Sequence, residues 1–562
     1  MSKDGKKPLG DSSVFQKGRK GAMRVIYGRT AIIAVSFLAQ IILIGGVVNF
    51  FRPYIPMFFG GYMVLGLGIV LLILNKETTP ETKLMWTVIT MLLPLVGAAL
   101  YVYVETQPGY RLLAKRLNDI YKQTEAFVQQ DEAVLDALEQ KDIGTAQLAR
   151  YVHKNGNFAT YQNTEVTFFP LGEDKFAAML TELEQAEQFI FMEYFILKEG
   201  YMWEKILEIL ERKVQAGVEV RVMYDGTCAM FDLPFRYPEL LKAKGIQCKM
   251  FAPIRPILST HYNNRDHRKI LVIDGKVGFT GGVNIGDEYI NRVEKHGHWK
   301  DTAVMLKGDA VQGLTMMFLQ MWNVTEKEPE YGKYLQKAEK ASQAKGFVLP
   351  YGDSPFDDEP VGETVYMDIL NRAKKYVHIM TPYLIIDQSM ITALTFAAKR
   401  GVDVKLILPH IPDKKFVFAL AKSHYKELLK AGVRIYEYTP GFVHAKIFTS
   451  DDEKAVVGTI NLDYRSLYLH FECAAFLYQV EEIAEIEKDF QRTLEKCQEV
   501  TLENRKKGTF FLRLEGWLLK WLAPLITEAA YAGDAVALEI FRSAGDVLAR
   551  QMIALLNRDP VW

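Results

Sequence analysis

Three long uncharged stretches near the start of the chain restrict its possible folds most. They occupy residues 30–51, 54–74 and 84–104, and none of them contains Asp, Glu, Lys or Arg. About 20 apolar residues in a helix, rising 1.5 Å each, cross the ~30 Å hydrocarbon core of a bilayer. The stretches therefore predict a multi-pass membrane anchor over residues 30–104. Pro94 predicts a kink in the third helix.

The basic residues predict which side of the membrane each segment faces. The leader, residues 1–29, contains eight Lys and Arg residues, and basic flanks stay in the cytoplasm. Three crossings would then place the rest of the chain outside the cytoplasm. Basic residues also follow the third stretch, at Arg111, Lys115 and Arg116, and the sidedness would reverse if one of the three stretches were re-entrant. Both arrangements stay open at this stage.

The composition of the whole chain excludes several classes of protein. The 68 Lys and Arg residues balance the 68 Asp and Glu residues, whereas a nucleic-acid partner favours a basic excess. The apolar share of 49% is typical of folded rather than disordered chains. None of the four cysteines forms a C-x-x-C pair, which excludes a zinc ribbon and a thioredoxin motif.

Matching segments divide the remainder into two similar lobes. Residues 217–225 read GVEVRVMYD and residues 401–409 read GVDVKLILP, and each follows a helix-like stretch. Apolar strands after helices are typical of α/β units. We therefore predict two α/β lobes, residues 151–325 and 347–500, related by a pseudo-twofold axis. The other predicted segments are a helical connector at 105–150, a charged linker at 326–346 and a helical C-terminal extension at 501–562.

A further pair of matching segments carries candidate chemistry. Residues 267–284 read HRKILVIDGKVGFTGGVN, and residues 444–461 read HAKIFTSDDEKAVVGTIN. Both fit the pattern H-x-K-x4-D-x6-G-[GT]-x-N, and two copies at equivalent places in a repeat are a specific signal. The candidate residues are His267, Lys269, Asp274, Gly281, Gly282 and Asn284 in the first copy, and His444, Lys446, Asp451, Thr459 and Asn461 in the second.

These residue types suit the transfer of a phosphoryl group. Two lysines and two asparagines form a cationic, hydrogen-bonding cradle for one phosphate. One neutral histidine attacks phosphorus while the other, protonated, gives its proton to the leaving oxygen. An incoming hydroxyl then resolves the phosphohistidine. Because the lysines supply the charge that a cation would otherwise provide, we expect no metal and no other cofactor.

Strand geometry separates the motif residues into two groups. Residues two apart in a strand share a face, so His267 and Lys269 point the same way. Asp274 is seven positions from His267 and falls on the opposite face, as Asp451 does in the second copy. We expect both aspartates to support the fold rather than to react. The glycines at 281–282 would let backbone approach a ligand, with N–H groups placed to hold an oxyanion.

The paired motifs resemble those of the phospholipase D superfamily. The stretch 84–103, with LLPLVGAALYVY after a Trp, and the segments EYFILKEG (193–200) and GHWKDTAVMLKGDAV (297–311) are similar to bacterial cardiolipin synthases. The likeness runs from about residue 54 to residue 500. It implies two tandem phospholipase D-like α/β sandwich lobes. It also implies that the protein belongs to the bacterial cytoplasmic membrane. It also implies transfer of a phosphatidyl group from one phosphatidylglycerol to another, with release of glycerol.

The resemblance also implies roles for individual residues. It favours His267 as the nucleophile and His444 as the acid and then the base. The family orients its histidines with acidic residues, and Glu472 and Asp301 are the candidates here. Two positions depart from the family pattern, because Asp266 and His470 stand where asparagine is usual. Each departure would alter a histidine pKa or the preference for an acceptor.

Three other functions stay open from the sequence. A phospholipase D hydrolase would use water as acceptor, and a different transphosphatidylase would use another phospholipid or alcohol. The membrane anchor favours the synthase, because a dry site lets an alcohol outcompete water. A lipid-binding scaffold with inactive motifs is the third possibility, but both copies keep their His, Lys, Asp and Asn residues. Nothing in the sequence predicts the oligomeric state.

Overall fold

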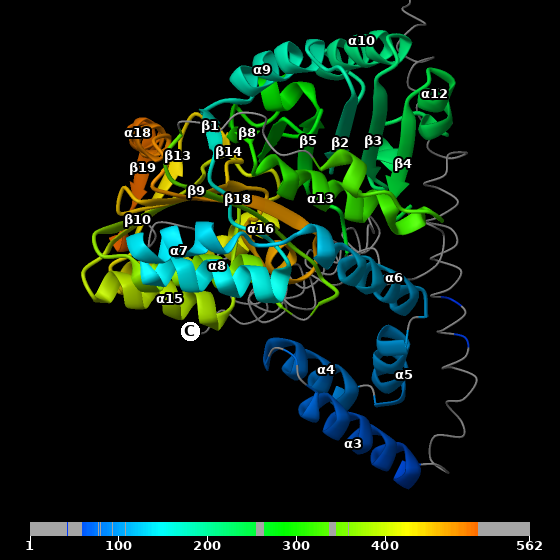
Figure 1. Ribbon diagram of the computed structural model, residues 1–562. Helices are drawn as coiled ribbons and strands as arrows, with labels where there is room; N and C mark the ends of the chain where they lie inside the picture. Colours follow the sequence, from blue (N-terminus) through cyan, green and yellow to red (C-terminus); the bar gives the residue numbers. More distant parts are fainter. Residues whose placement is uncertain are drawn as a thin grey trace, which may run out of the picture. The chain divides into compact units, whose positions relative to one another are not determined.

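The computed structural model describes residues 59–253, 264–335 and 344–503, except positions 77, 79, 93, 107 and 358, together with positions 42 and 46. The leader, nearly all of the stretch 30–51, residues 54–58 and nearly all of the C-terminal extension lie outside the described residues. The chain forms two compact units. One contains the N-terminal helices and the other contains both lobes (Figure 1).

Three helices make up the described part of the N-terminal unit: α3 (Phe59–Asn75), α4 (Pro80–Leu92) and α5 (Pro94–Thr106). Where the sequence predicts one kinked helix over 84–104, the structure has two helices, because α4 ends at Leu92 and α5 begins at Pro94. Pro94 explains the break, since its ring and missing N–H cannot continue a helix but suit the first position of a new one. Among the described helices, none combines the length and apolar character needed to cross a membrane.

The second unit begins with helices α6 (Pro108–Thr124), α7 (Glu132–Lys141) and α8 (Ile143–Gly156). Aspartates cap the last two, because Asp131 accepts a hydrogen bond from Ala133 N and Asp142 accepts one from Thr145 N. Such caps satisfy backbone N–H groups that a helix start leaves unpaired.

The first lobe is built on a seven-stranded sheet with the order β1-β8-β6-β5-β2-β3-β4. Its strands are β1 (Thr164–Phe169), β2 (Phe189–Tyr194), β3 (Glu219–Asp225), β4 (Gln247–Phe251), β5 (Lys269–Ile273), β6 (Val277–Gly281) and β8 (Ala303–Gly308). Strands β2, β3 and β4 are parallel, and the others pair antiparallel. Its helices are α9 (Gly172–Glu184), α10 (Tyr201–Gln215), α11 (Cys228–Phe231), α12 (Tyr237–Ala243) and α13 (Val311–Trp322).

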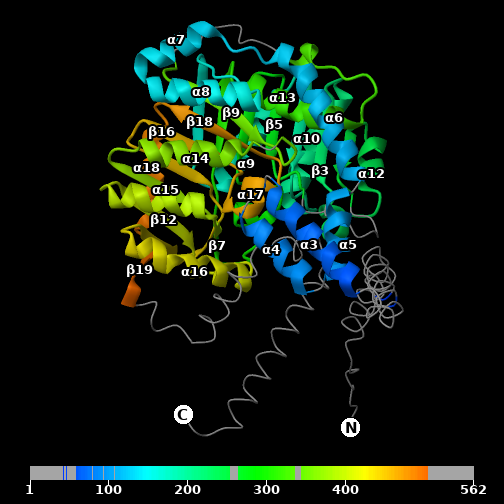
Figure 2. The same ribbon diagram turned by 90° about the horizontal axis from the view of Figure 1, so that it is seen from below.

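The second lobe repeats this order in an eight-stranded sheet, β19-β13-β12-β10-β15-β16-β18-β9. Its strands are β9 (Phe347–Asp353), β10 (Tyr376–Met380), β12 (Asp403–Pro409), β13 (Arg434–Tyr438), β15 (Ile447–Ser450), β16 (Lys454–Gly458), β18 (Glu472–Tyr478) and β19 (Cys497–Val500). Its helices are α14 (Val361–Arg372), α15 (Gln388–Lys399), α16 (Lys415–Lys430), α17 (Tyr464–Tyr468) and α18 (Ile483–Leu494). Figure 2 shows α14 and α15 side by side.

The two lobes share an apolar core. Helix α13 contributes Leu314 and Phe318 to a buried cluster that also contains Val272 of the first sheet and Ile447 and Val457 of the second. Strand β6 also lies against β16 and β18 of the other lobe. Burial of apolar surface on both sheets holds the lobes together. The expected α/β fold with two sheet-containing lobes is confirmed.

Candidate active site

Each histidine motif folds into a β-hairpin at the centre of its sheet. The first motif forms β5 and β6, and the second forms β15 and β16. The turn between β5 and β6 uses left-handed backbone at Asp274 (φ +53°) and Gly275 (φ +65°). This agrees with the hairpin signal of an Asp-Gly pair.

The motif aspartates hold the starts of neighbouring strands. Asp274 accepts hydrogen bonds of 2.8 Å from the backbone N–H groups of Glu187, Gln188 and Phe189 at the start of β2. Asp451 accepts bonds of 2.7, 2.8 and 3.0 Å from Lys374, Lys375 and Tyr376 at the start of β10. The carboxylates therefore occupy equivalent supporting positions in the two lobes, as the strand geometry predicts.

Short backbone pairings between the lobes position the two histidines. Asp266 bridges Phe471 of the other lobe, and His267 N donates to Phe471 O at 2.9 Å. Strands β7 (His298–Lys300) and β14 (Gly441–Val443) form the equivalent pairing, and His444 N donates to Lys300 O at 2.7 Å. Each histidine thus lies where its own lobe meets the other.

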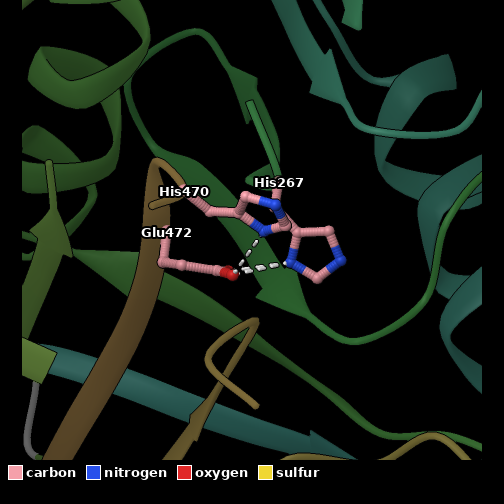
Figure 3. Close-up of side chains that lie close together, drawn as sticks. All are labelled: His267, His470 and Glu472. Carbon is pink, nitrogen blue, oxygen red and sulfur yellow. Dashed lines mark hydrogen bonds and ion pairs between the residues drawn. The ribbon is translucent and has the colours of Figure 1, made fainter. Parts of the chain in front are cut away.

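These pairings give each histidine a carboxylate from the opposite lobe. His267 Nδ1 lies 2.9 Å from both carboxylate oxygens of Glu472, and Figure 3 shows the ring beside the carboxyl group. His444 Nδ1 lies 2.6 Å from Asp301 Oδ2. Glu472 and Asp301 are the residues that the sequence suggests as orienting groups. Their crosswise assignment comes only from the structure. With Nδ1 engaged, Nε2 of each ring is left for chemistry.

Two buried lysines add positive charge beside the histidines. The ammonium groups of Lys269 and Lys446 each donate to the backbone carbonyl of the histidine in their own motif, and Lys446 Nζ also lies 2.9 Å from His444 Nδ1. Burial lowers the pKa of Lys269 to about 8 and that of Lys446 to about 7. An incoming phosphate would favour the charged form of both.

The two histidine–carboxylate pairs differ in their electrostatics. Burial, followed by the charge of Lys269, lowers the pKa of His267 well below its usual value. Burial and Lys446 lower the pKa of His444 to about 4, although Asp301 opposes the shift. Burial raises the pKa of Glu472 well above the usual range. Although burial also acts on Asp301, the neighbouring His444 and Lys446 lower its pKa.

This asymmetry distinguishes the two histidines. Asp301 stays ionised and raises the pKa of His444 against the effects of burial and Lys446, which favours the acid role for His444. His267 is neutral, and a neutral imidazole is the form that attacks phosphorus. The two sites therefore suit different halves of an acid–base and nucleophilic reaction.

The glycines of the first motif make room for protein rather than for an oxyanion. Gly282 N donates to Thr302 O at 2.9 Å, so the expectation that this N–H holds a substrate oxyanion is wrong. A Cβ at Gly282 would lie 2.0 Å from Asp301 Oδ1, and one at Gly281 would lie 2.5 Å from Ala303 Cα. Glycine at position 282 thus allows Asp301 to reach His444.

Asn284 has its hydrogen-bonding capacity used within the protein. Its Oδ1 accepts from Ile196 N at 3.0 Å, and its Nδ2 donates to Tyr289 OH at 3.0 Å. The substrate contact expected of this side chain is replaced by a support for the loop after β2. Within the part of the chain that the structure describes, Asn461 Oδ1 lacks a hydrogen-bond partner. Asn461 therefore stays a candidate for substrate binding.

Thr459 supports Glu472. Its hydroxyl donates to the Glu472 carboxylate, and Cys473 N donates to the same hydroxyl at 2.9 Å. The sequence groups Thr459 with substrate-binding residues because it matches Gly282. The structure places both positions behind the histidine–carboxylate pairs, where Gly282 makes space and Thr459 adds a hydrogen bond.

His470 is a third histidine of the site, and the sequence marks it only as a departure from the family pattern. It is 6% exposed, and its ring centroid lies 5.3 Å from that of His267. Its Nδ1 lies 3.5 Å from Glu472 Oε1 (Figure 3). Neither ring nitrogen has a hydrogen-bond partner among the described residues. Burial and the charge of Arg465 lower its pKa well below the usual value, so the ring is neutral.

His470, His267 and Glu472 also form the kind of cluster that metals bind. One ligand atom from each lies within 4.8 Å of the others. The charge of Lys269 acts on both histidines of this cluster, and positive charge opposes a divalent cation. The arrangement fits an anionic substrate better than a metal ion.

Comparison with known proteins shows which family the chain is similar to. Residues 179–322 and 366–494 match the family model described as "Cardiolipin synthase, PLD-like domain". A cardiolipin synthase of Alkalihalophilus pseudofirmus is 34% identical over 82% of this chain and 92% of its own length. One from Halalkalibacterium halodurans has the same identity and the same coverage. A Streptococcus mutans protein is 51% identical over 82% of this chain and all of its own length.

The fold also has a counterpart among solved structures. Phosphatidylserine synthase from Haemophilus influenzae matches with a TM-score of 0.51 and 16% identity, over 68% of this chain and 98% of that chain. The two-lobed fold and the duplicated histidine site thus define a phospholipase D-like phosphatidyltransferase. The chain belongs to the cardiolipin synthase family.

Proposed function

We propose that the protein is a cardiolipin synthase of the bacterial cytoplasmic membrane that uses two molecules of phosphatidylglycerol. The observation that carries this proposal is the crosswise pair of histidines, each held at Nδ1 by a buried carboxylate of the other lobe. Two buried lysines lie beside them. This group can hold one phosphate and attack it from one side while donating a proton on the other.

In the first half of the reaction, Lys269, Lys446 and Asn461 bind the phosphate of the donor lipid. His267 Nε2 attacks phosphorus, forming a P–N bond as the bond to the glycerol oxygen breaks. His444 gives its proton to that oxygen, and glycerol leaves. The ionised Asp301 stabilises the protonated His444 before this transfer, because opposite charges in a buried site interact strongly.

In the second half, the terminal glycerol hydroxyl of another phosphatidylglycerol enters on the side of His444. His444 accepts the hydroxyl proton, the oxygen attacks phosphorus, and the bond to His267 breaks. Cardiolipin is released and both histidines return to their starting protonation states. The same intermediate attacked by water would give phosphatidic acid, so acceptor choice separates a synthase from a hydrolase.

A product assay tests this function. Detergent-purified protein receives phosphatidylglycerol as the sole lipid, without added metal, and cardiolipin, glycerol and phosphatidic acid are followed. Cardiolipin with matching glycerol is the expected result. Phosphatidic acid alone would make the protein a hydrolase, and no turnover would place its donor or acceptor elsewhere.

Trapping of the intermediate tests the residue roles. With labelled donor lipid, His444→Ala is expected to accumulate phosphatidyl-enzyme that carries label on His267, because the base for the second half is missing. His267→Ala is expected to accumulate none. Label on His444 in the His267→Ala variant would reverse the two roles.

A further inference from the structure

The helices α4 and α5 fold back on each other within the N-terminal unit. The rings of Trp86 in α4 and Tyr101 in α5 lie 5.4 Å apart in an edge-to-face contact. Fifteen residues of continuous helix would separate them by about 22 Å. Lys76, just before α4, forms an ion pair of 2.6 Å with Glu105 in the last turn of α5. The two ends of this segment therefore lie together.

We propose that α4 and α5 form a re-entrant hairpin, which dips into the lipid bilayer and returns to the side from which it came. Each helix has 13 residues and is about 20 Å long at 1.5 Å per residue. The hydrocarbon core is about 30 Å thick. Neither helix is long enough to cross the hydrocarbon core alone. Because α5 folds back along α4, the two helices together do not cross the core either.

The side chains of the hairpin suit a lipid environment. The stretch 84–104 has no charged residue. At the tip between the helices, Met91 is 69% exposed and Leu92 is 74% exposed. The charged residues Lys76 and Glu105 lie at the open end, where headgroups and water would be. An apolar tip with a charged base is the pattern expected of a segment that enters the bilayer from one face.

A close approach of the two helices keeps the hairpin shut. A Cβ at Gly97 in α5 would lie 2.7 Å from Thr90 Cα in α4, so only glycine fits without moving the backbone. The side chain of Pro94 also meets α3, because a Cβ at Gly66 would lie 3.0 Å from Pro94 Cβ. Small residues at helix contacts are typical of packing in membranes.

A re-entrant hairpin returns the chain to the side of the membrane from which α4 enters. Lys83 lies near the start of α4, and Arg111, Lys115 and Arg116 follow α5. Basic residues at both ends of the hairpin agree with the excess of basic residues on cytoplasmic flanks. We therefore expect the open end of the hairpin to face the cytoplasm.

Cysteine labelling in cells tests this topology independently of any catalytic activity. Of the four native cysteines, only Cys497 is not fully buried, so the background carries Cys497→Ser. Asn75→Cys and Arg111→Cys report the two ends of the hairpin. With a membrane-impermeant maleimide, both ends are expected to react only in inside-out vesicles. Reaction of Arg111→Cys in intact cells would overturn the proposal.

A pair of glycine variants tests the hairpin contact itself. Gly97→Val is expected to force α5 away from α4 and to change the labelling of Arg111→Cys. Gly68→Val is the matched control, because nothing lies within 4 Å of a Cβ at that position of α3. Wild-type labelling and expression in Gly97→Val would contradict the hairpin, whereas the same result in Gly68→Val is expected.

Discussion

His267 and Glu472 are 205 residues apart in the chain, yet His267 Nδ1 lies 2.9 Å from both oxygens of the Glu472 carboxyl group. The pair joins the two lobes, and His444 and Asp301 form the second such pair in the opposite direction. Each motif histidine thus takes its carboxylate from the opposite lobe. The duplicated fold is therefore required for the site to exist, rather than supplying two independent sites.

We predict that Asp301→Asn lowers kcat by about 10²–10⁴-fold, because the loss of a charge that orients and stabilises a catalytic histidine has effects of this order. KM should change little, since Asp301 lies behind His444 and not against the substrate. Steady-state cardiolipin formation measures both constants. The control is Asp489→Asn, which removes a buried partner of Lys300 without touching a histidine. It should lower thermal stability but keep kcat, and an unchanged kcat in Asp301→Asn would refute the role.

Much of the site follows from the sequence because its residues recur at fixed spacing. The histidines, the lysines and the supporting aspartates are all members of one repeated pattern, and strand periodicity separates Asp274 and Asp451 from the reacting groups. The repeat also predicts two similar lobes. These features depend on local order along the chain, which a sequence displays directly.

Other features depend on contacts that no local pattern encodes. The crosswise pairing of Glu472 and Asp301 arises from backbone bridges between lobes, such as that between Asp266 and Phe471. From the sequence, Gly282 resembles an oxyanion-binding glycine. In the structure, Asp301 occupies the space that a side chain at position 282 would need. Pro94 predicts only a kink, because proline disfavours helix continuation but does not specify how far the chain turns.

The supporting aspartates should affect stability rather than chemistry. Asp274→Ala removes the acceptor of three backbone N–H groups, and we expect it to lower the free energy of unfolding by about 2–4 kcal/mol. Thermal unfolding of the purified variant measures the loss. Specific activity of the folded fraction should stay near that of the wild type. Asp451→Ala provides the matched test in the other lobe, and a loss of kcat without a loss of stability would show a chemical role instead.

The lysine pKa values predict an alkaline limit to activity. Lys446 and Lys269 are cations below pKa values of about 7 and about 8, and each loses its charge as the pH rises through its value. The phosphate cradle of the free enzyme then weakens, so kcat/KM should begin to fall above about pH 7 and should fall further above about pH 8. Bound phosphate raises both pKa values, so kcat should fall only at higher pH.

A pH profile of both constants checks this prediction. Lys446→Arg is the informative variant, because a guanidinium stays charged throughout the range. In this variant, the pH at which kcat/KM falls should rise toward the pKa of Lys269, which is about 8. A wild-type kcat/KM that stays level to about pH 10 would show that neither lysine needs its charge.

His470 gives opposite predictions for stability and activity. Its two ring nitrogens are buried without hydrogen-bond partners in the described structure, and an unsatisfied buried polar group destabilises a fold. His470→Phe keeps an aromatic ring against Phe195 and His267 but removes both nitrogens. The thermal midpoint should therefore stay level or rise.

We expect activity to fall in the same variant, because an unpartnered ring nitrogen beside His267 can hydrogen-bond the phosphatidyl group once it binds. Loss of one such bond, about 1.4 kcal/mol, corresponds to a roughly tenfold lower kcat/KM. His470→Asn, which keeps a donor and an acceptor, should recover part of the loss. If His470→Phe instead unfolds at lower temperature and its activity merely follows the folded fraction, His470 is a packing residue and makes no contact with substrate.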